Sequence, residues 1–345
     1  MKIALISTPF FGTPPPTYGG LEVVVWNLAN GLTKLGHKVV LFAPKGSKVP
    51  KNGFLVECGK AYNTVNVDWI EAERNMWKVY DKKLDDFDIV NGHDWFGFEY
   101  ASKVRNPSLK VCHTHHGGLN LNWWKRSKPP FKLNLVAISK WMKEVYKDQG
   151  FESKHVYNGV DLSQYPFSEN KGDRLLFLGR ISKIKAPHLA IEVAKKLDMG
   201  LDIIGGTSFV DDPNYVEEVK RMCDGEKIKF IGEVEHSVKV RYLQEAKALL
   251  IPSRFGEPFG LIAVESMACG TPPIALDDGA LKEIIEDGKS GFICKDVEEM
   301  IKKVEEIDTI NLKDCRERSK LFSKEVMSRN YVEEIYKPIL NGEEW

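Results

Sequence analysis

Hydrophobic residues in the first half of the chain alternate between short continuous runs and segments with helical spacing. The run at residues 2–7 is followed by apolar positions at helical spacing over 21–35, and Gly36 is suited to end that helix. Because continuous runs are typical of strands buried on both faces, they indicate an open parallel sheet. Its further strands are expected at 39–42, 88–91, 110–114 and 133–138.

The same alternation recurs in the second half of the chain. It predicts a helix over 186–197, with Pro187 in its first turn, and strands at 175–178, 201–204, 228–231, 248–251 and 273–276. Residues 157–170 carry turn residues and little periodicity, which favours a connection between two domains. Two doubly wound α/β domains would place ligand sites at the carboxyl ends of their strands.

Length and composition narrow the function classes. The 345 residues suit two compact domains, and no apolar run approaches the roughly 20 residues of a membrane span. The 49 basic and 49 acidic residues balance, so charge gives no reason to expect a nucleic-acid partner. Six cysteines without a CxxC pair suit a reducing compartment, and the first residues do not resemble an export signal. We therefore expect a cytoplasmic protein.

Two cations lie where a strand gives way to a helix. Arg180 follows the strand expected at 175–178, and Lys185 comes five residues later. Arg offers a planar donor fork, Lys a point charge and the helix start free amides, a combination that suits a diphosphate. The alternative is two ordinary surface cations.

Two glutamates follow the strand expected at 248–251. Glu257 precedes a helix opened by Pro258 and Gly260, and Glu265 lies within that helix. A carboxylate accepts two hydrogen bonds at once, which matches adjacent hydroxyls on a ribose or hexose. The alternative is a helix-entry acid that favours the helix dipole, followed by a solvated glutamate.

With these residues in place, the chain resembles the retaining GT-B glycosyltransferases of family 4 over nearly its whole length. The matching stretches are Tyr18-Gly19-Gly20, Gly31-Leu32 with Gly36-His37, His93-Asp94-Trp95, Thr114 to His116, Ala137-Ile138-Ser139, Asn158 to Asp161, Gly179-Arg180 with Lys185, and Glu257 to Thr271.

The resemblance implies two Rossmann-like doubly wound parallel-sheet domains facing a central cleft. Residues 1–158 would bind the acceptor and 159–322 the nucleotide-sugar donor, while a terminal helix at 323–345 would cross back onto the first domain. The same resemblance implies that the donor is held by Arg180 and Lys185 on its diphosphate, Glu265 on its ribose, and Glu257 with the amides of Phe259, Gly260 and Leu261 on its sugar. Ala186 departs from the family's usual Gly, with little harm expected because Ala is compatible with a helix.

Two features of the first half are candidate contacts, the loop with Gly19 and Gly20 and the strand end at His93. The loop before the first helix lacks a GxGxxG fingerprint, yet Gly19 and Gly20 allow close backbone approach. The resemblance makes this loop a contact to donor phosphate or acceptor, and the alternative is a proline-stiffened connector. His93 ends a strand and could donate to a sugar hydroxyl, or it could help Asp94 to cap the next helix.

His113, His115 and His116 raise the question of a metal site. Strand alternation sends His113 and His115 to one face and His116 to the other, so a compact triad of ligands is not expected. The Thr-x-His pattern of the resembling family selects His116 as the residue near the reacting sugar. We expect neither a metal nor a cofactor.

Aromatic and basic residues gather at 123–132, in an expected loop. The indoles of Trp123 and Trp124 could stack on an acceptor sugar, and the basic neighbours also suit a lipid headgroup interface. The alternative is a partly packed surface loop. Peripheral membrane contact is therefore left open.

These features and the resemblance predict a glycosyltransferase that moves a hexose from a nucleotide diphosphate sugar to a hydroxyl acceptor without a metal ion. The resemblance implies retention of anomeric configuration, and a glucose-type hexose linked to UDP is the expected donor. The acceptor could be a carbohydrate, a lipid-linked sugar or a small molecule. The alternatives are a nucleotide-sugar epimerase of the same architecture, a phosphorylase and a non-catalytic sugar-nucleotide binding protein. The residues by themselves do not specify the nucleotide base, the hexose or the acceptor, and they leave the oligomeric state open.

Overall fold

The computed structural model describes residues 1–16, 19–64, 66–117, 121–127, 129–207 and 212–345. The chain divides into two compact units: Met1–Gly159 with Lys324–Trp345, called unit 1, and Val160–Ser323, called unit 2. The domain ranges expected from the sequence differ from these units by one residue at each boundary.

Unit 1 is built on a parallel sheet. In its described residues, seven strands pair in the order β3-β2-β1-β4-β5-β6-β7. The interior strand β1 pairs with β2 on one side and β4 on the other, so that Ile3 lies beside Val39 and Ile89, and all three are buried. The strands are β1 (Lys2–Ile6), β2 (Lys38–Ala43), β3 (Phe54–Glu57), β4 (Ile89–Gly92), β5 (Val111–His115), β6 (Leu135–Ala137) and β7 (Ser153–His155).

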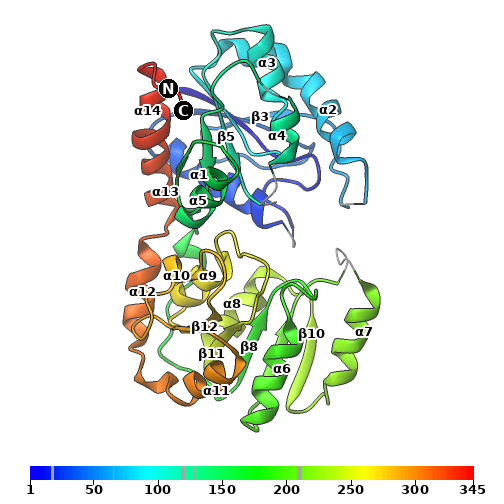
Figure 1. Cartoon of the computed structure of the whole chain (residues 1–345), viewed down its shortest axis with the longest axis vertical. Coiled ribbons are helices and arrows are strands. Elements are labelled where there is room, and N and C mark those ends of the chain that lie inside the picture. The colour runs from blue at the N-terminus through cyan, green and yellow to red at the C-terminus, as the bar shows by residue number, and fades with distance from the viewer. Residues whose placement is uncertain (17–18, 65, 118–120, 128, 208–211) are drawn as a thin grey trace. The chain divides into compact units, whose positions relative to one another are not determined.

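Helices flank this sheet (Figure 1). The first, α1 (Gly20–Lys34), directs Val24, Leu28 and Leu32 into the core at helical spacing. The others before the chain enters unit 2 are α2 (Trp69–Tyr80), α3 (Glu99–Arg105), α4 (Asn122–Ser127) and α5 (Lys140–Asp148).

The end of the chain belongs to unit 1 and consists of α13 (Lys324–Asn330), a π-helical segment (Tyr331–Tyr336) and α14 (Lys337–Leu340). Helix α13 packs closely on α1, because a Cβ at Gly31 would lie only 1.9 Å from Oγ of Ser328. In the π-helical segment, the Tyr331 hydroxyl lies 2.9 Å from Oγ1 of Thr114 and the Tyr336 hydroxyl accepts from Asn91 at 3.0 Å. The segment is therefore fastened to β4 and β5.

Unit 2 repeats the architecture. Its described residues form a six-stranded parallel sheet in the order β10-β9-β8-β11-β12-β13. The strands are β8 (Leu175–Leu178), β9 (Leu201–Ile204), β10 (Ile228–Gly232), β11 (Ala248–Ile251), β12 (Pro273–Leu276) and β13 (Phe292–Cys294). The helices are α6 (Pro187–Lys196), α7 (Pro213–Met222), α8 (His236–Glu245), α9 (Leu261–Ala268), α10 (Leu281–Ile284), α11 (Val297–Glu305) and α12 (Leu312–Lys320).

The prediction of two Rossmann-like, doubly wound parallel sheets is confirmed. In both units the order of strands reverses direction beside the first strand, which is where such folds bind ligands at the carboxyl ends of the strands. No helix within the described ranges is both long enough and apolar enough to cross a membrane.

Candidate active site

The carboxyl ends of β8 and β11 in unit 2 bring Lys185 and Glu257 together. Nζ of Lys185 lies 2.5 Å from Oε2 of Glu257 and 4.4 Å from the centre of the Phe255 ring. Both charged side chains are largely buried. Arg180 stands in the same loop as Lys185, two residues after the end of β8, and is half-buried. Two of the expected donor-binding residues thus form one ion pair at the sheet edge.

Ala186, between Lys185 and α6, has a left-handed backbone conformation with φ 53° and ψ 50°. The expectation that Ala is harmless here because it suits a helix is wrong, since the residue lies just outside α6. An L-residue in this conformation costs roughly 1–2 kcal/mol, whereas Gly adopts it freely.

The loop after Glu257 leads into α9 through Gly260, whose φ of 91° is also left-handed. Phe259 is buried and packs on Phe322 with ring centres 5.8 Å apart, so only its backbone is left for a ligand. At the start of α9 the amide of Ala263 donates to the carbonyl of Gly260 at 3.0 Å, and Gly260 offers no side chain to cap the other first amides of the helix. This arrangement suits the expected role of these amides.

Glu265, on α9, is buried against two residues that the sequence did not single out. Its Oε1 accepts from the Tyr165 hydroxyl at 2.6 Å, and Lys239 on α8 lies 3.1 Å from Oε1 and 3.0 Å from Oε2. Burial, followed by the charge of Glu265, raises the pKa of Tyr165 well above its usual value, so the hydroxyl stays protonated and donates. No local motif marks either partner, because both come from segments distant in sequence.

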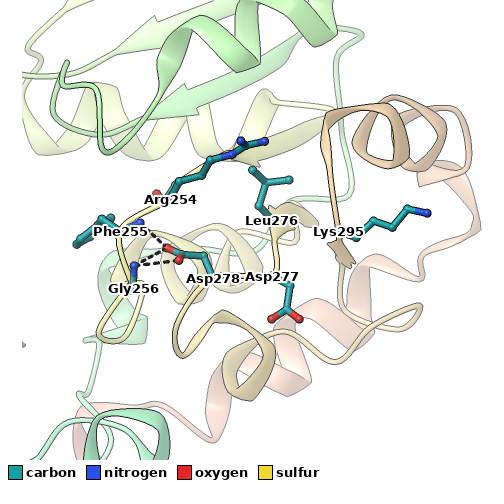
Figure 2. A pocket seen from close by; sticks show the side chains of 8 residues that line it. Arg254, Phe255, Gly256, Leu276, Asp277, Asp278 and Lys295 are labelled. Atoms are coloured by element: carbon teal, nitrogen blue, oxygen red, sulfur yellow. Dashed lines mark hydrogen bonds between the residues drawn. The ribbon is translucent and has the colours of Figure 1, made fainter. Parts of the chain in front are cut away.

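A pocket of about 440 Å³ lies beside the loop that leads to Glu257 (Figure 2). It is lined by the residues that precede Glu257 and by the residues that end or follow β12 and β13. None of the expected donor-binding side chains lines it. The lining residues are Ser253, Arg254, Phe255, Gly256, Leu276, Asp277, Asp278 and Lys295.

In unit 1, His93 and His116 form a pair. Nδ1 of His93 lies 2.8 Å from Nε2 of His116, and His93 is completely buried while His116 is partly exposed. Burial lowers the pKa of His116 to about 3 and that of His93 well below its usual value, so both rings are neutral near pH 7. In this structure His93 therefore contacts His116 rather than offering a donor at the surface.

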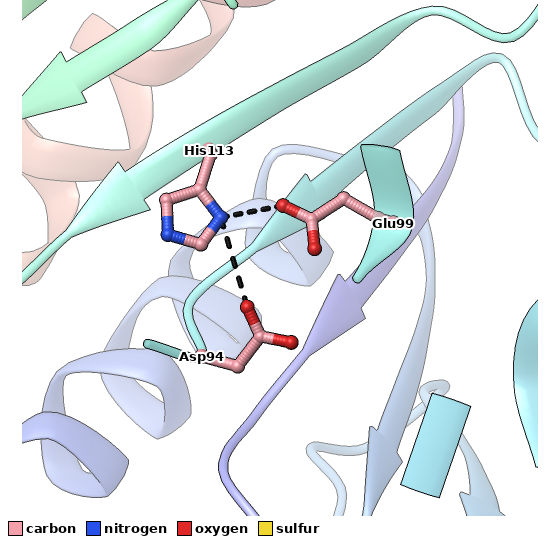
Figure 3. Close-up of side chains that lie close together, drawn as sticks. All are labelled: Asp94, Glu99 and His113. Atoms are coloured by element: carbon pink, nitrogen blue, oxygen red, sulfur yellow. Dashed lines mark hydrogen bonds and ion pairs between the residues drawn. The ribbon is translucent and has the colours of Figure 1, made fainter. Parts of the chain in front are cut away.

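The other two histidines have structural partners. Nδ1 of His115 lies 2.7 Å from the Tyr146 hydroxyl, and Nδ1 of His113 lies 2.5 Å from Glu99 and 3.7 Å from Asp94 (Figure 3). The triad of His113, His115 and His116 is thus not assembled. A different set, Asp94, Glu99 and His113, has its potential ligand atoms within 4.8 Å of one another.

The carboxyl groups of Asp94 and Glu99 favour the protonated form at neutral pH. Burial raises the pKa of Asp94 and of Glu99 to about 8, and it lowers the pKa of His113 to about 4. His113 is therefore neutral, and the hydrogen bond between its Nδ1 and Oε1 of Glu99 joins two uncharged groups. Asp94 also accepts from the amide of Gly97 at 3.0 Å, in the turn before α3. The N-cap of α3 is Phe98 and has no side-chain hydrogen bond, so Asp94 does not cap that helix.

The glycine loop before α1 is closely packed. Gly19 has a φ of 139°, and a Cβ there would lie 2.7 Å from Oε2 of Glu22. Gly20 begins α1, and Tyr18 lies outside the described residues. Glu22 was missed by the sequence analysis: it is buried, accepts from the Thr8 hydroxyl, and has its pKa raised by burial to about 7.

The first part of the aromatic and basic segment is the helix α4 (Asn122–Ser127) and not the expected loop, whereas residues 129–132 are irregular. Trp124 is buried and packs with its ring centre 4.7 Å from that of His113 and 5.3 Å from that of Tyr100. Its expected role in stacking on an acceptor is therefore wrong. Nothing is described of the Trp123 side chain, and Lys128 also lies outside the described residues; Lys125 and Arg126 are exposed.

Comparison with known proteins agrees with this architecture. The model of glycosyltransferase family 4 matches residues 18–164, and that of glycosyl transferases group 1 matches residues 163–322. Spore coat protein SA of Bacillus subtilis is 30% identical over 96% of both chains. The chain belongs to the family 4 glycosyltransferases.

Solved structures resemble this glycosyltransferase over its full length. Sucrose-phosphate synthase from Thermosynechococcus elongatus superposes with a TM-score of 0.79 at 17% identity, over 99% of this chain and 100% of the other. Anabaena HepE in complex with UDP and glucose gives a TM-score of 0.75 at 16% identity, over 98% and 100%. The fold of the glycosyltransferase is GT-B, as the sequence predicted.

Proposed function

We propose that this glycosyltransferase transfers a glucose-type hexose from a UDP-linked nucleotide sugar to a hydroxyl acceptor, with retention of anomeric configuration and without a metal ion. The observation that carries the proposal is the Lys185 and Glu257 pair at the carboxyl ends of β8 and β11. A cation suited to a diphosphate and a carboxylate suited to sugar hydroxyls lie in contact, as a nucleotide sugar requires. The complex of HepE with UDP and glucose supports this choice of donor.

The donor would lie along the edge of the unit 2 sheet. Arg180 and Lys185 hold its diphosphate, and Glu257 with the amides of Phe259, Gly260 and Leu261 holds the hexose. Glu265 accepts from a ribose hydroxyl through Oε2, which has a lone pair beyond the one taken by Lys239, whereas Oε1 already accepts from both Tyr165 and Lys239. In unit 1, His116 is the proposed contact to the transferred sugar, while Gly19 and Gly20 contact donor phosphate or acceptor.

Charge stabilisation drives the proposed reaction. The bond between the anomeric carbon and the diphosphate breaks, the bond to the acceptor oxygen forms on the same face, and the leaving phosphate takes the acceptor's proton. Negative charge grows on the diphosphate, so Arg180 and Lys185 bind the transition state more tightly than the ground state. One such donor is typically worth about 3–4 kcal/mol.

The acceptor is proposed only by class, as a carbohydrate, a lipid-linked sugar or another hydroxyl compound. The proposal includes peripheral contact with an anionic lipid surface, because the basic residues Lys125 and Arg126 are exposed on α4. Nucleic acid is not proposed as a partner, because the net formal charge is zero.

A mass-spectrometric donor screen tests the function. The protein is incubated with UDP-, GDP- and ADP-sugars, with and without a pool of acceptors from a cell extract, beside the Arg180→Ala variant. Release of nucleotide together with hexose mass on an acceptor, lost in Arg180→Ala and kept in EDTA, supports the proposal. Isomerised donor without transfer would replace it with an epimerase, and tight binding without any turnover would replace it with a sugar-nucleotide binding protein.

A further inference from the structure

Asp278, two residues after β12, holds the backbone of the loop that carries Glu257. Its carboxylate accepts hydrogen bonds from three consecutive amides: Phe255 at 3.2 Å, Gly256 at 2.9 and 3.1 Å, and Glu257 at 3.0 Å. Figure 2 shows the carboxylate pointing into this loop. Successive amides that converge on one point form a concave site for an anion, and here a side chain of the protein itself fills it.

The two loops also meet backbone to backbone. The amide of Ala280 donates to the carbonyl of Glu257 at 2.8 Å. A Cβ at Gly279, whose φ is 60°, would lie 2.2 Å from that carbonyl oxygen and 2.4 Å from the Glu257 nitrogen. Only glycine permits this approach, so the position of Glu257 along the loop is fixed by residues 278–280.

Both contacts of Lys185 depend on the same loop. Its Nζ lies 2.5 Å from the Glu257 carboxylate and 4.4 Å from the centre of the Phe255 ring. Phe255 and Glu257 are the two outer members of the three residues whose amides bind Asp278. A shift of that backbone would therefore move the cation and the carboxylate of the candidate site together.

We propose that Asp278 is a positioning residue for the transfer reaction: by filling the amide site of residues 255–257, it holds Glu257 and Lys185 in their working geometry. The expected loss of kcat rests on the proposed function, whereas the effect of Asp278 on the loop does not. Asp278 acts through the loop and not on the substrate. It also keeps an anion-binding site beside the diphosphate cations occupied, so that the donor phosphates bind to Arg180 and Lys185 instead.

The test compares Asp278→Ala with Asp277→Ala. Asp277 is the adjacent residue and a matched control, because it is exposed and its side chain is 3.5 Å from Lys282 on the surface. We expect Asp278→Ala to lose about 10²-fold in kcat, the scale of a misplacement near 1 Å, with a small change in donor KM. Formate can enter the emptied amide site, so it should raise the kcat of Asp278→Ala at least tenfold. Asp277→Ala should keep the wild-type kcat, and formate should not change it.

Amide hydrogen exchange of residues 255–257, measured without substrate, separates this inference from the proposed function. Faster exchange in Asp278→Ala that slows again with formate supports the positioning role even if the wild-type protein transfers no sugar. Unchanged exchange, or lost activity that formate does not restore in a folded variant, would overturn it. If Asp278→Ala does not fold, Asp278→Asn takes its place: its amide can accept from fewer of the three amides, so intermediate exchange is expected and wild-type exchange counts against the inference.

Discussion

Lys239 lies 3.1 Å and 3.0 Å from the two carboxylate oxygens of Glu265, and both side chains are largely buried. Because the pair is shielded from water, removing the cation leaves a buried carboxylate with Tyr165 as its remaining hydrogen-bond donor among these residues. We therefore predict that Lys239→Met lowers the free energy of unfolding by about 1–3 kcal/mol. Urea unfolding measures the change.

The matched control for this prediction is Lys220→Met. Lys220 pairs with Glu217 on the exposed surface of α7, with 44% and 62% of the two side chains exposed. Exposed pairs contribute roughly 0–1 kcal/mol, so the control should change the unfolding free energy little. Equal losses in both variants would show that Lys239 contributes no more than a surface charge.

Lys185 should be required for binding the nucleotide diphosphate. A hydrogen bond to a charged group contributes about 1.5–3 kcal/mol, which predicts a UDP dissociation constant about 10- to 100-fold weaker in Lys185→Gln. Isothermal titration calorimetry with UDP measures it. Lys183→Gln is the control, because Lys183 is exposed and pairs with Asp212. Similar affinities in wild type and Lys185→Gln would remove Lys185 from the diphosphate site.

Trp124 belongs to the core of unit 1, which makes a clear prediction for stability. Replacing a buried aromatic residue by Ala typically costs 3–5 kcal/mol, so Trp124→Ala should lower the unfolding free energy by about that amount. Lys125→Ala, the exposed neighbour on α4, should stay within about 0.5 kcal/mol of wild type. A loss below about 1 kcal/mol in Trp124→Ala would mean that the indole is not packed as described.

The strands missed by the sequence analysis lie at the edges of the sheets. Strands β3 (Phe54–Glu57), β7 (Ser153–His155) and β13 (Phe292–Cys294) are short and have a neighbour on one side only. Phe54 and Glu57 are exposed, so β3 lacks the continuous apolar run that marked the central strands. Runs that are buried on both faces were predicted to within two residues, because burial alone dictates their composition.

From the sequence, residues of the candidate site could be named only where a local pattern or the family resemblance marks them. Arg180, Lys185 and Glu257 lie between the end of a strand and the start of a helix, and Glu265 lies within α9, so local pattern and family resemblance both marked them as candidates. Asp278 and Lys239 were not predictable, because their partners are 21 to 26 residues away and are brought close only by the packing of neighbouring loops and helices. The burial of Trp124 was not predictable, because an aromatic residue beside basic ones has the same sequence pattern on a surface and at the edge of a core.

Glu99 predicts how stability depends on pH. Burial raises its pKa in the folded protein to about 8 from an ordinary value of 4.5. The folded state therefore holds a proton that the unfolded state releases, so this contribution is complete below about pH 4.5 and is lost as the pH rises through 8. The buried histidines, whose pKa values are lowered, contribute in full above about pH 6.5 and do not interfere in the window from pH 6.5 to 8.

Across that window, wild type should lose stability more steeply than Glu99→Gln, which has no proton to release at this position. One released proton corresponds to about 1.4 kcal/mol per pH unit, which is the difference in slope expected from Glu99 itself. Urea unfolding at half-unit pH intervals measures it. Glu57→Gln serves as the control, since Glu57 is exposed on β3 and should leave the slope unchanged. Parallel slopes for wild type and Glu99→Gln would contradict the prediction, because they would mean that Glu99 holds no proton in the folded protein across this window.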